Sequence, residues 1–358
     1  MRAAVFALTE QGAVLAKVIK QAVPQAVAVF LPERMKREYA SEDWHFFSHF
    51  GSALQESFSC YDALVCIMAT GIVVRTLAPL LKDKLADPAV VVCDERGSFA
   101  ISLLSGHVGG GNFFTRQLAE AIGAQPVITT ATDVEGRLAP DAFAGQLALL
   151  PWPKTRIKTI NKALLEREKI DYLVSPFLSH RDFYVKELVK WQLPYREKAE
   201  YSYHVCLCPR DELPEEHEVP DKTLYLTPPR LIAGVGCRRN VPKELVWQAL
   251  ENACQKIGRD ISFLDAMASV SVKADEAGLL AAARELGVAI EFYEAELLQQ
   301  RTEEFHLHQS GFVKRQVGTG NVCEAAAICE GLRHSERIRF ALPKTKYEQV
   351  TVALLWCW

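Results

Sequence analysis

The sequence lacks a long apolar run and an excess of charge of either sign. No stretch reaches the roughly 18 consecutive apolar residues that a transmembrane helix needs. Lys and Arg total 41 against 44 Asp and Glu, a formal net charge of −3, whereas nucleic-acid-binding domains usually carry a basic face. The opening MRAAVFALTEQG is typical of a short strand and has no signal-peptide cleavage site. We therefore expect a cytoplasmic protein with no membrane and no nucleic-acid partner.

The sequence also lacks paired cysteines. It contains ten cysteines, but none stands in a CxxC pair, the spacing that is typical of zinc and redox sites. In an intracellular chain such scattered thiols are usually reduced and mostly buried. We therefore expect no disulfide framework and no metal site made by the protein.

Motifs for nucleotide binding and for a serine nucleophile are missing as well. No Gly-Lys-Ser/Thr follows the glycine-rich segment 106–111, so this segment is not a P-loop. The stretch GVGCRRN at 234–240 has Arg239 where a dinucleotide fingerprint needs its third glycine. No GxSxG nucleophile elbow is supported. These absences argue against nucleotide-dependent enzymes and leave other anionic ligands open.

What the sequence does contain is an alternation of apolar strands and helical patterns near both ends. Strand patterns at 3–8, 26–31 and 62–69 alternate with helical patterns at 12–22, 70–81 and 112–123, and 89–105 is typical of a hairpin. A chain of 358 residues exceeds the usual size of a single core. The sequence predicts an α/β protein with mostly parallel sheets in two domains, 1–133 and 230–358, joined by a less regular α/β middle segment and linker, 134–229.

The segment SGHVGGGN is the strongest candidate for a ligand site. It leads from an apolar run into a helix, which we expect Asn112 to cap. Glycines let backbone amides approach a ligand, and a helix start carries free N–H groups with partial positive charge. His107 can exchange protons near neutral pH. The alternative is a sharp turn whose histidine only bonds the backbone. The expected ligand-binding residues are Ser105, Gly106, Gly109, Gly110, Gly111 and Asn112.

Two further junctions follow strands of the first domain. Open α/β sheets bind ligands at the carboxyl ends of their strands, where we expect both junctions to lie. The stretch ATGIVVR offers Thr70, Gly71 and Arg75, and TTATD offers Thr130 and Asp133. A simple helix cap at Thr70 explains the first junction about equally well, and ordinary turn chemistry is the alternative for TTATD.

Cations stand beside glycines in the last domain. Guanidinium groups pair with carboxylates through two hydrogen bonds, so such junctions suit a carboxylate ligand. Each junction is a weak signal alone, but together they favour a large ligand with many carboxylates. The expected binding residues here are Gly236, Arg238, Arg239, Lys273 and Lys344.

These motifs resemble those of one family. ATGIVVR, DERGSFAISLLSGHVGGGN and VITTATD resemble the N-terminal domain of the cobalt-precorrin-5A hydrolase family of anaerobic cobalamin biosynthesis. GVGCRRN, VKADEAGLL, VGTGNVCEAAA and PKTKYEQVTVA resemble its C-terminal domain. Because several separate motifs occur in the right order, the resemblance is specific. One departure is Gly111, where we expect alanine in that family.

The resemblance implies a substrate and a reaction. The family opens the δ-lactone on the A-ring acetate of cobalt-precorrin-5A and releases the C20 carbon with its methyl group as acetaldehyde, giving cobalt-precorrin-5B. The substrate is a cobalt corrinoid that bears many carboxylates. Its cobalt belongs to the substrate, so no protein metal and no other cofactor are implied. Transient contact with neighbouring pathway enzymes is expected. Non-catalytic corrinoid binding or handover is the alternative function.

For this reaction we expect His107 to act as general base and then as general acid. Asp133 is the substitute base, or the group that orients His107. The amides of Gly109, Gly110 and Gly111 are expected to stabilise the tetrahedral oxyanion. A competing role for His107 is axial ligation of the substrate's cobalt.

Overall fold

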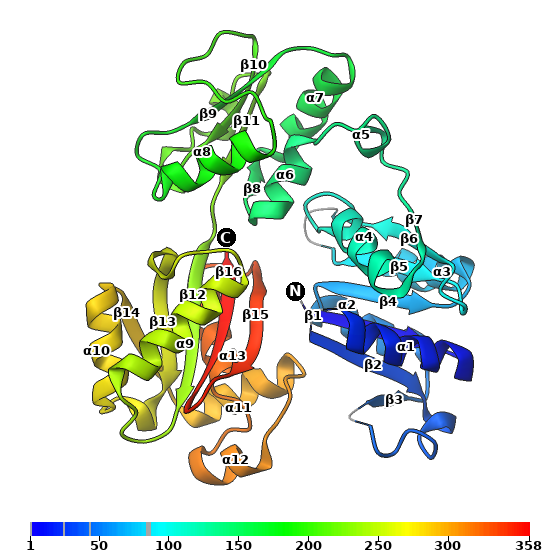
Figure 1. The fold of residues 1–358 in the computed structure, drawn as a ribbon, viewed down its shortest axis with the longest axis vertical. Helices are drawn as coiled ribbons and strands as arrows, with labels where there is room; N and C mark the ends of the chain where they lie inside the picture. Colours follow the sequence, from blue (N-terminus) through cyan, green and yellow to red (C-terminus); the bar gives the residue numbers. More distant parts are fainter. Residues whose placement is uncertain (1, 24–25, 43, 84–86) are drawn as a thin grey trace. The chain divides into compact units, whose positions relative to one another are not determined.

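The computed structural model describes residues 2–23, 26–42, 44–83 and 87–358, which form three β-sheets covered by helices (Figure 1). Residues Ala3–Pro228 make one unit that contains the first two sheets, and Pro229–Trp358 make a second unit around the third sheet. The predicted α/β class is confirmed, but each sheet mixes parallel and antiparallel pairs. Within the described residues no helix is long and apolar enough to span a membrane.

The first sheet is built on strands that are buried on both faces. Strands β1, β4 and β5 pair in parallel, and every side chain of β4 and β5 is buried, which explains their continuous apolar runs. The sheet order is β3(His45–Phe47), β2(Ala26–Pro32), β1(Arg2–Ala7), β4(Ala63–Ile67), β5(Ala89–Cys93), β6(Phe99–Leu104), β7(Gln125–Val127).

Helices cover the two faces of this sheet. On one face α2(Phe50–Cys60) and α3(Thr70–Leu77) enclose a core that contains Phe6, Leu64 and Leu77. On the other face α1(Glu10–Ala22) packs against α4(Gly111–Ile122) and approaches Ile67. Thr70 is the first helical residue of α3 and does not cap it, because the N-cap position belongs to Ala69.

The strand reversal at β6 divides the site residues between two edges of the sheet. Strand β6 runs antiparallel to β5, with Leu104 beside Val90, and β7 is parallel to β6. The loop after β6 therefore leaves at the amino edge of β4 and β5, whereas Thr70 follows their carboxyl ends. The prediction that the ATGIVVR and TTATD junctions share the carboxyl edge is wrong, because the hairpin reverses the chain direction and TTATD follows β7, which is parallel to β6.

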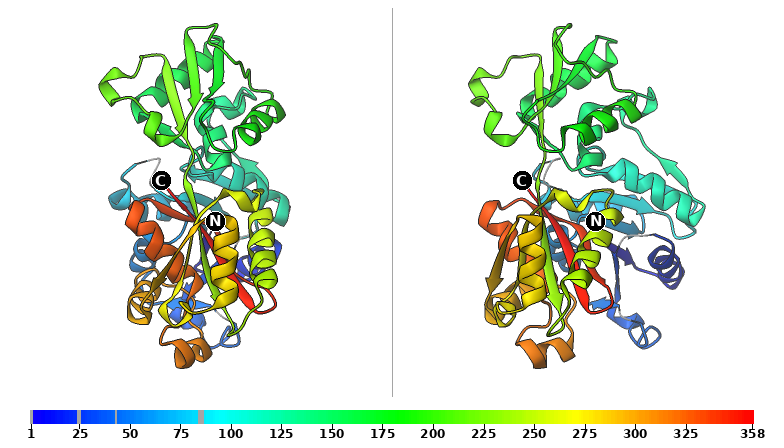
Figure 2. Two further views of the ribbon diagram at one scale, coloured as in Figure 1. Left: turned by 90° about the vertical axis from the view of Figure 1, so that its left-hand side faces the viewer. Right: turned by 60° about the vertical axis from the view of Figure 1, so that its left-hand side comes forward.

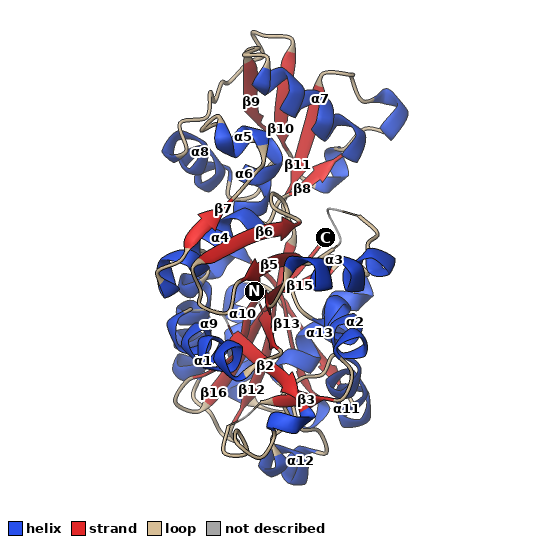
Figure 3. Ribbon diagram, turned by 90° about the vertical axis from the view of Figure 1, so that its right-hand side faces the viewer, coloured by secondary structure: helices blue, strands red, loops and turns tan. Residues whose placement is uncertain are grey.

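The middle segment is more regular than the sequence predicts. Its sheet has the order β8(Leu150–Trp152), β11(Thr223–Thr227), β10(Tyr203–Leu207), β9(Ile170–Val174), with only β8 antiparallel to its neighbour. Helices α7 and α8 lie along this sheet (Figure 3). The helices of the segment are α5(Ala131–Val134), α6(Pro140–Leu147), α7(Lys154–Leu165) and α8(Arg181–Lys190). The strands are short and partly polar, so their pattern in the sequence is weak.

The third sheet combines three parallel strands with a terminal hairpin. Its order is β14(Ala289–Tyr293), β13(Leu264–Val270), β12(Arg230–Cys237), β16(Val350–Cys357), β15(Ile338–Lys346). Strands β12, β13 and β14 are parallel, whereas β16 is antiparallel to both of its neighbours, so the sheet is mixed. Helices α9(Lys243–Lys256) and α10(Ala277–Leu286) pack side by side (Figure 2). The remaining helices of this unit are α11(Ala295–Glu304), α12(Gly311–Val317) and α13(Cys323–His334).

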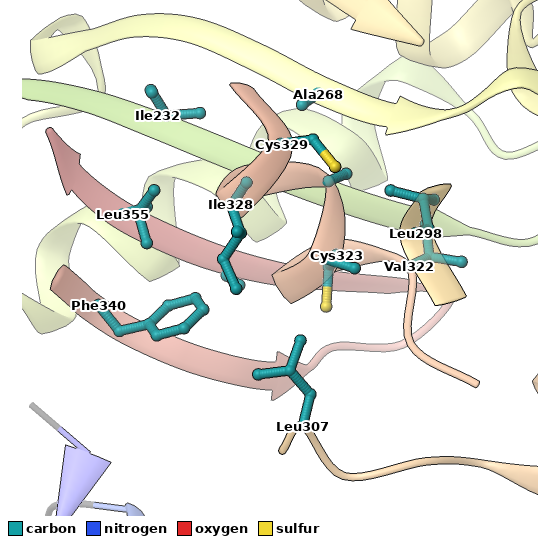
Figure 4. Close-up of a cluster of buried hydrophobic side chains, with 14 of the residues drawn as sticks. Ile232, Ala268, Leu298, Leu307, Val322, Cys323, Ile328, Cys329, Phe340 and Leu355 are labelled. Atoms are coloured by element: carbon teal, nitrogen blue, oxygen red, sulfur yellow. The ribbon is translucent and has the colours of Figure 1, made fainter. Parts of the chain in front are cut away.

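Helix α13 forms the centre of the core of the second unit. Its residues from Cys323 to Gly331 are all buried, and Figure 4 shows Cys323 and Ile328 among side chains from the surrounding elements. The helix lies so close to β12 that a β-carbon on Gly234 would stand 1.8 Å from the carbonyl oxygen of Cys323. Only glycine fits at this crossing. Seven of the ten cysteines are buried and the other three are half-buried, so the prediction that most are buried is confirmed.

Short 3₁₀ helices complete the list of elements. They are η1(Glu33–Met35), η2(Ala78–Leu80), η3(Arg210–Glu212), η4(Glu216–Glu218), η5(Ile261–Phe263) and η6(Ser271–Lys273).

Candidate functional site

The loop between β6 and α4 is tightly folded around its glycines. Ser105 and Gly110 both have a positive φ, at 53° and 79°. A β-carbon on Gly109 would lie 2.5 Å from the β-carbon of Ser105, so a larger residue would displace the loop. Helix α4 begins at Gly111 with Gly110 as its N-cap. The prediction that Asn112 caps this helix is wrong, since its side chain is used elsewhere.

The backbone amides of this loop are mostly engaged within it. The N–H of Gly110 donates to the carbonyl of His107, and that of Gly111 donates to Ser105. These bonds correct the expectation that both amides face a ligand. Among the described residues the Gly109 N–H has no hydrogen-bond partner, and the buried hydroxyl of Ser105 has none either.

Asn112 links three segments of the chain. Its Nδ2 donates to Oδ2 of Asp133 at 2.8 Å and to the hydroxyl of Thr130 at 3.0 Å. Its Oδ1 accepts from the hydroxyl of Ser102 at 2.7 Å. This buried amide therefore ties β6 and α4 to the segment after β7. The structure brings together Ser105–Asn112, Thr130 and Asp133, as their positions along β6 and β7 require.

His107 stands between two carboxylates. Its Nδ1 lies 3.0 Å from Oδ1 of Asp141, and its Nε2 lies 3.4 Å from Oδ2 of Asp133. The same Nε2 is 3.3 Å from the hydroxyl of Thr132. Oδ1 of Asp133 also accepts from Arg116 at 2.7 Å. The imidazole side chain is only 14% exposed, so these neighbours set its charge state.

The carboxylates raise the pKa of His107 above its ordinary value of 6.5. Burial alone lowers this pKa, but the hydrogen bonds and charges of Asp141 and Asp133 raise it by more. A larger fraction of His107 is therefore imidazolium at neutral pH than in a free histidine. Such a group can donate a proton directly, and it must lose its proton before it can act as a base.

Asp141 is a functional candidate that sequence reasoning missed. It lies in the first turn of α6, in a segment that offers almost no recognisable chemistry in the sequence. An acidic residue after Pro140 is an ordinary helix-start pattern, because it complements the helix dipole. Nothing in this pattern indicates that the carboxylate is buried against His107.

Thr70, Gly71 and Arg75 lie at the other edge of the first sheet. Arg75 donates through Nη1 to the carbonyl of Gly71 at 3.0 Å, one turn back along α3. This bond is a local helix contact. The structure therefore does not bring these three residues to the His107 loop.

The predicted residues of the second unit gather near one edge of the third sheet. Gly236 lies near the end of β12, and Arg238 and Arg239 follow the strand directly. Lys273 follows β13, which runs parallel to β12. Lys344 lies two strands from β12, on β15, near the same edge. Two of these cations already have acidic partners. Arg239 pairs with Asp275, and the buried Lys273 lies 3.4 Å from Oε2 of Glu276.

The described part of the chain offers no cluster of ligands for a resident metal ion. Among residues 2–23, 26–42, 44–83 and 87–358, no three His, Cys, Asp or Glu side chains converge in a way that could hold one. Both ring nitrogens of His107 already face polar partners. Axial ligation of a substrate's cobalt by this residue would replace the contacts at Nε2.

Comparison with known proteins identifies the same two regions. Residues 52–133 match the family model "Cobalamin synthesis G N-terminal", and residues 231–355 match "Cobalamin synthesis G C-terminus". The first match includes the His107 loop and Asp133, but ends before Asp141. The second covers nearly all of the third sheet and its helices.

The chain is also similar to whole proteins. It is 39% identical to the cobalt-precorrin-5A hydrolase of Salmonella typhimurium over 94% of both chains. It is 29% identical to the protein of that name from Priestia megaterium, over 98% of this chain and 94% of the relative. The crystal structure of a cobalamin biosynthesis protein G homolog from Sulfolobus solfataricus has the same fold, with a TM-score of 0.59 and 19% identity over 99% of this chain and 96% of that one. This chain therefore belongs to the cobalt-precorrin-5A hydrolase family of cobalamin biosynthesis.

Proposed function

We propose that this chain hydrolyses cobalt-precorrin-5A. Water opens the δ-lactone of the A-ring acetate, and the C20 carbon leaves with its methyl group as acetaldehyde, which gives cobalt-precorrin-5B. The full-length similarity to two proteins named for this activity supports the proposal. The cobalt ion enters and leaves as part of the substrate.

The observation that carries the mechanism is the placement of Nε2 of His107. Nδ1 faces the buried Asp141, whereas Nε2 faces Thr132 and Asp133. The side chain of Asp133 is 17% exposed and that of Asp141 only 1%, so Nε2 is on the more accessible side of the ring. Lactone opening needs a proton for the departing alkoxide, and Nε2 is the atom that would supply it. General acid–base catalysis of this kind contributes about 10²–10⁴ in rate.

The charge state of His107 favours the role of acid before that of base. Because its pKa is raised, the imidazolium is available at the start of the cycle. Water adds to the lactone carbonyl, the ring C–O bond breaks, and the alkoxide takes the Nε2 proton. The neutral imidazole then accepts the proton that the added water releases when the new carboxylate forms, which restores the starting state. This order reverses the one expected from the sequence.

One backbone amide is suited to the oxyanion of the tetrahedral intermediate. The N–H of Gly109 lies two residues from His107 and has no partner within the described chain. A single well-placed donor is worth on the order of 10²–10³ in rate. We assign this role to Gly109 alone, because the amides of Gly110 and Gly111 are occupied.

The cations of the second unit are proposed to bind peripheral carboxylates of the substrate. Arg238 is exposed at the end of β12 and is suited to two-pronged pairing with a carboxylate. Arg239 and Lys273 would exchange their acidic partners for the substrate's groups.

Acetaldehyde release tests the proposal. Purified protein is mixed with cobalt-precorrin-5A, and acetaldehyde is measured by reduction with alcohol dehydrogenase and NADH. We expect His107→Gln to lower turnover by about 10²–10⁴ at saturating substrate. His217→Gln, at an exposed histidine of η4, is the matched control and should leave turnover unchanged. Near-normal turnover of His107→Gln would disprove its role, and binding without acetaldehyde would indicate a handover protein.

A further inference from the structure

Asp141 is a buried carboxylate with a defined set of partners. Its side chain is 1% exposed, and Oδ1 accepts from Nδ2 of Asn161 at 3.0 Å in addition to facing Nδ1 of His107. Burying an ionised carboxylate costs several kcal/mol unless charged or hydrogen-bonding partners offset the loss of water. The imidazole of His107 and the amide of Asn161 both help to offset the cost of this burial.

The backbone around Asp141 is shaped for this contact. Gly145 follows Asp141 by four residues on α6, so both lie on the same helix face. A β-carbon on Gly145 would stand 2.6 Å from the carbonyl oxygen of His107. The glycine lets α6 lie directly against the loop, and this approach brings the Asp141 carboxylate to the ring. The position of α6 and the Asp141–His107 contact therefore both serve to hold the carboxylate against the imidazole.

The two ring nitrogens face different chemistry. An ionised carboxylate only accepts hydrogen bonds, so Nδ1 must carry a proton wherever it bonds Asp141. Nε2 meets the Thr132 hydroxyl, which can donate or accept, and the carboxylate of Asp133. Nδ1 is 3.0 Å from Asp141, whereas Nε2 is 3.4 Å from Asp133. The two oxygens of Asp133 already accept from Asn112 and Arg116. In neutral His107 the single ring proton is therefore held at Nδ1, and Nε2 accepts from Thr132.

We propose that Asp141 is a positioning residue, which holds the Nδ1 proton of His107 and leaves Nε2 as the nitrogen that gains and loses protons. The consequence for turnover rests on the proposed function of His107. The tautomer itself does not, because it is a property of the free protein. Other groups around the ring act elsewhere: Asp133 and Arg116 lie on the Nε2 side, and Tyr172 lies close to Asp141.

Nitrogen NMR of the free protein tests this assignment directly. Protein labelled with ¹⁵N-histidine is titrated, and the His107 signals are assigned by their loss in His107→Gln. Above the pKa we expect Nδ1 to be protonated and Nε2 to be bare. In Asp141→Asn the preference for Nδ1 should be lost and the pKa of His107 should fall. Asp133→Asn is the matched control, which should lower the pKa but keep the proton on Nδ1.

The outcomes separate this proposal from the proposed function. A neutral His107 with its proton on Nε2 in the wild-type protein overturns the positioning role, and this measurement stands even when Asp141→Asn fails to fold. If the tautomer is as expected and Asp141→Asn lowers kcat at least about tenfold with little change in KM, both proposals hold. If the tautomer is as expected and turnover of Asp141→Asn is normal, Asp141 still positions the ring, but His107 is not the proton-transfer group.

Discussion

Nδ2 of Asn112 lies 2.8 Å from Oδ2 of Asp133, so the first turn of α4 fixes the carboxylate that faces His107. The same amide reaches Ser102 and Thr130. One buried side chain thus sets the spacing between two strands and the loop that holds the histidine. Proton-transfer groups work only when neighbours hold them in place, and here that neighbour is an amide with no charge of its own.

Replacing Asn112 should destabilise the first unit. Asn112→Ala removes three hydrogen bonds and leaves half-buried partners unsatisfied, which costs about 1–3 kcal/mol of unfolding free energy. Urea unfolding followed by circular dichroism measures this loss. Glu120→Ala, at an exposed position of the same helix, is the control and should change stability by less than about 0.5 kcal/mol. Equal stability of the two variants would show that the hydrogen bonds of Asn112 contribute nothing to the free energy of unfolding.

The stability of the fold should depend on pH through His107. The pKa of this residue in the folded protein is above the ordinary 6.5 of the unfolded chain. The folded state therefore binds the proton more tightly, and the stabilisation is fully present below about pH 6.5 and is lost as pH rises through the folded pKa. The difference in unfolding free energy between wild type and His107→Gln should be larger at pH 6 than at pH 8.5. A difference that grows with pH would mean that burial outweighs the two carboxylates.

Arg75→Ala should have little effect on catalysis. The guanidinium bonds the carbonyl of Gly71 on its own helix, at the edge of the sheet opposite to the His107 loop. We expect KM and kcat to change by less than about twofold and stability by less than about 0.5 kcal/mol. Arg116→Ala, which removes a partner of Asp133, should lower kcat/KM by a clearly larger factor. A tenfold increase in KM for Arg75→Ala would place substrate at the carboxyl edge after all.

Gly234→Ala should severely destabilise the second unit. The added β-carbon would meet the backbone of α13 at Cys323, and backbone atoms of a packed helix cannot move aside at low cost. We expect a loss of about 3 kcal/mol or more, seen as a lower urea midpoint of this unit. Gly311→Ala is the matched control, because Gly311 lies in a helix of the same unit. A β-carbon there would be 3.8 Å from its nearest neighbour, Nη1 of Arg315. A stable Gly234→Ala would show that α13 and β12 can separate.

The sequence predicts fully buried strands well, but it does not show in which direction a strand runs in the sheet. The runs at β4 and β5 are continuous and apolar because both faces are covered, so their identity as strands is clear from composition. The DERG hairpin is also predictable from its turn residues. The turn residues do not show that β6 and β7 run antiparallel to β5, so the sequence places Thr70 and TTATD at one edge although they lie at opposite edges.

The site was predictable only where its residues are close in sequence to glycines. His107 and Asp133 stand beside turn signals, which draw attention to them. Asp141 has no such signal, because its importance comes from a contact between α6 and the loop that depends on three-dimensional packing. The same holds for Asn112, whose position at a helix start suggested a cap, whereas its side chain turns inward to Asp133.

The reversal at β6 also provides an attachment site for a label. Residues 94–97 turn the chain at the edge of the first sheet opposite to the loop of His107, and Arg96 is exposed in this turn. A dye or a surface tether coupled through Arg96→Cys would therefore sit far from the proton-transfer groups. Because most native thiols are buried, such coupling can be selective. The protein could be immobilised by this turn and still present its chemistry to solution.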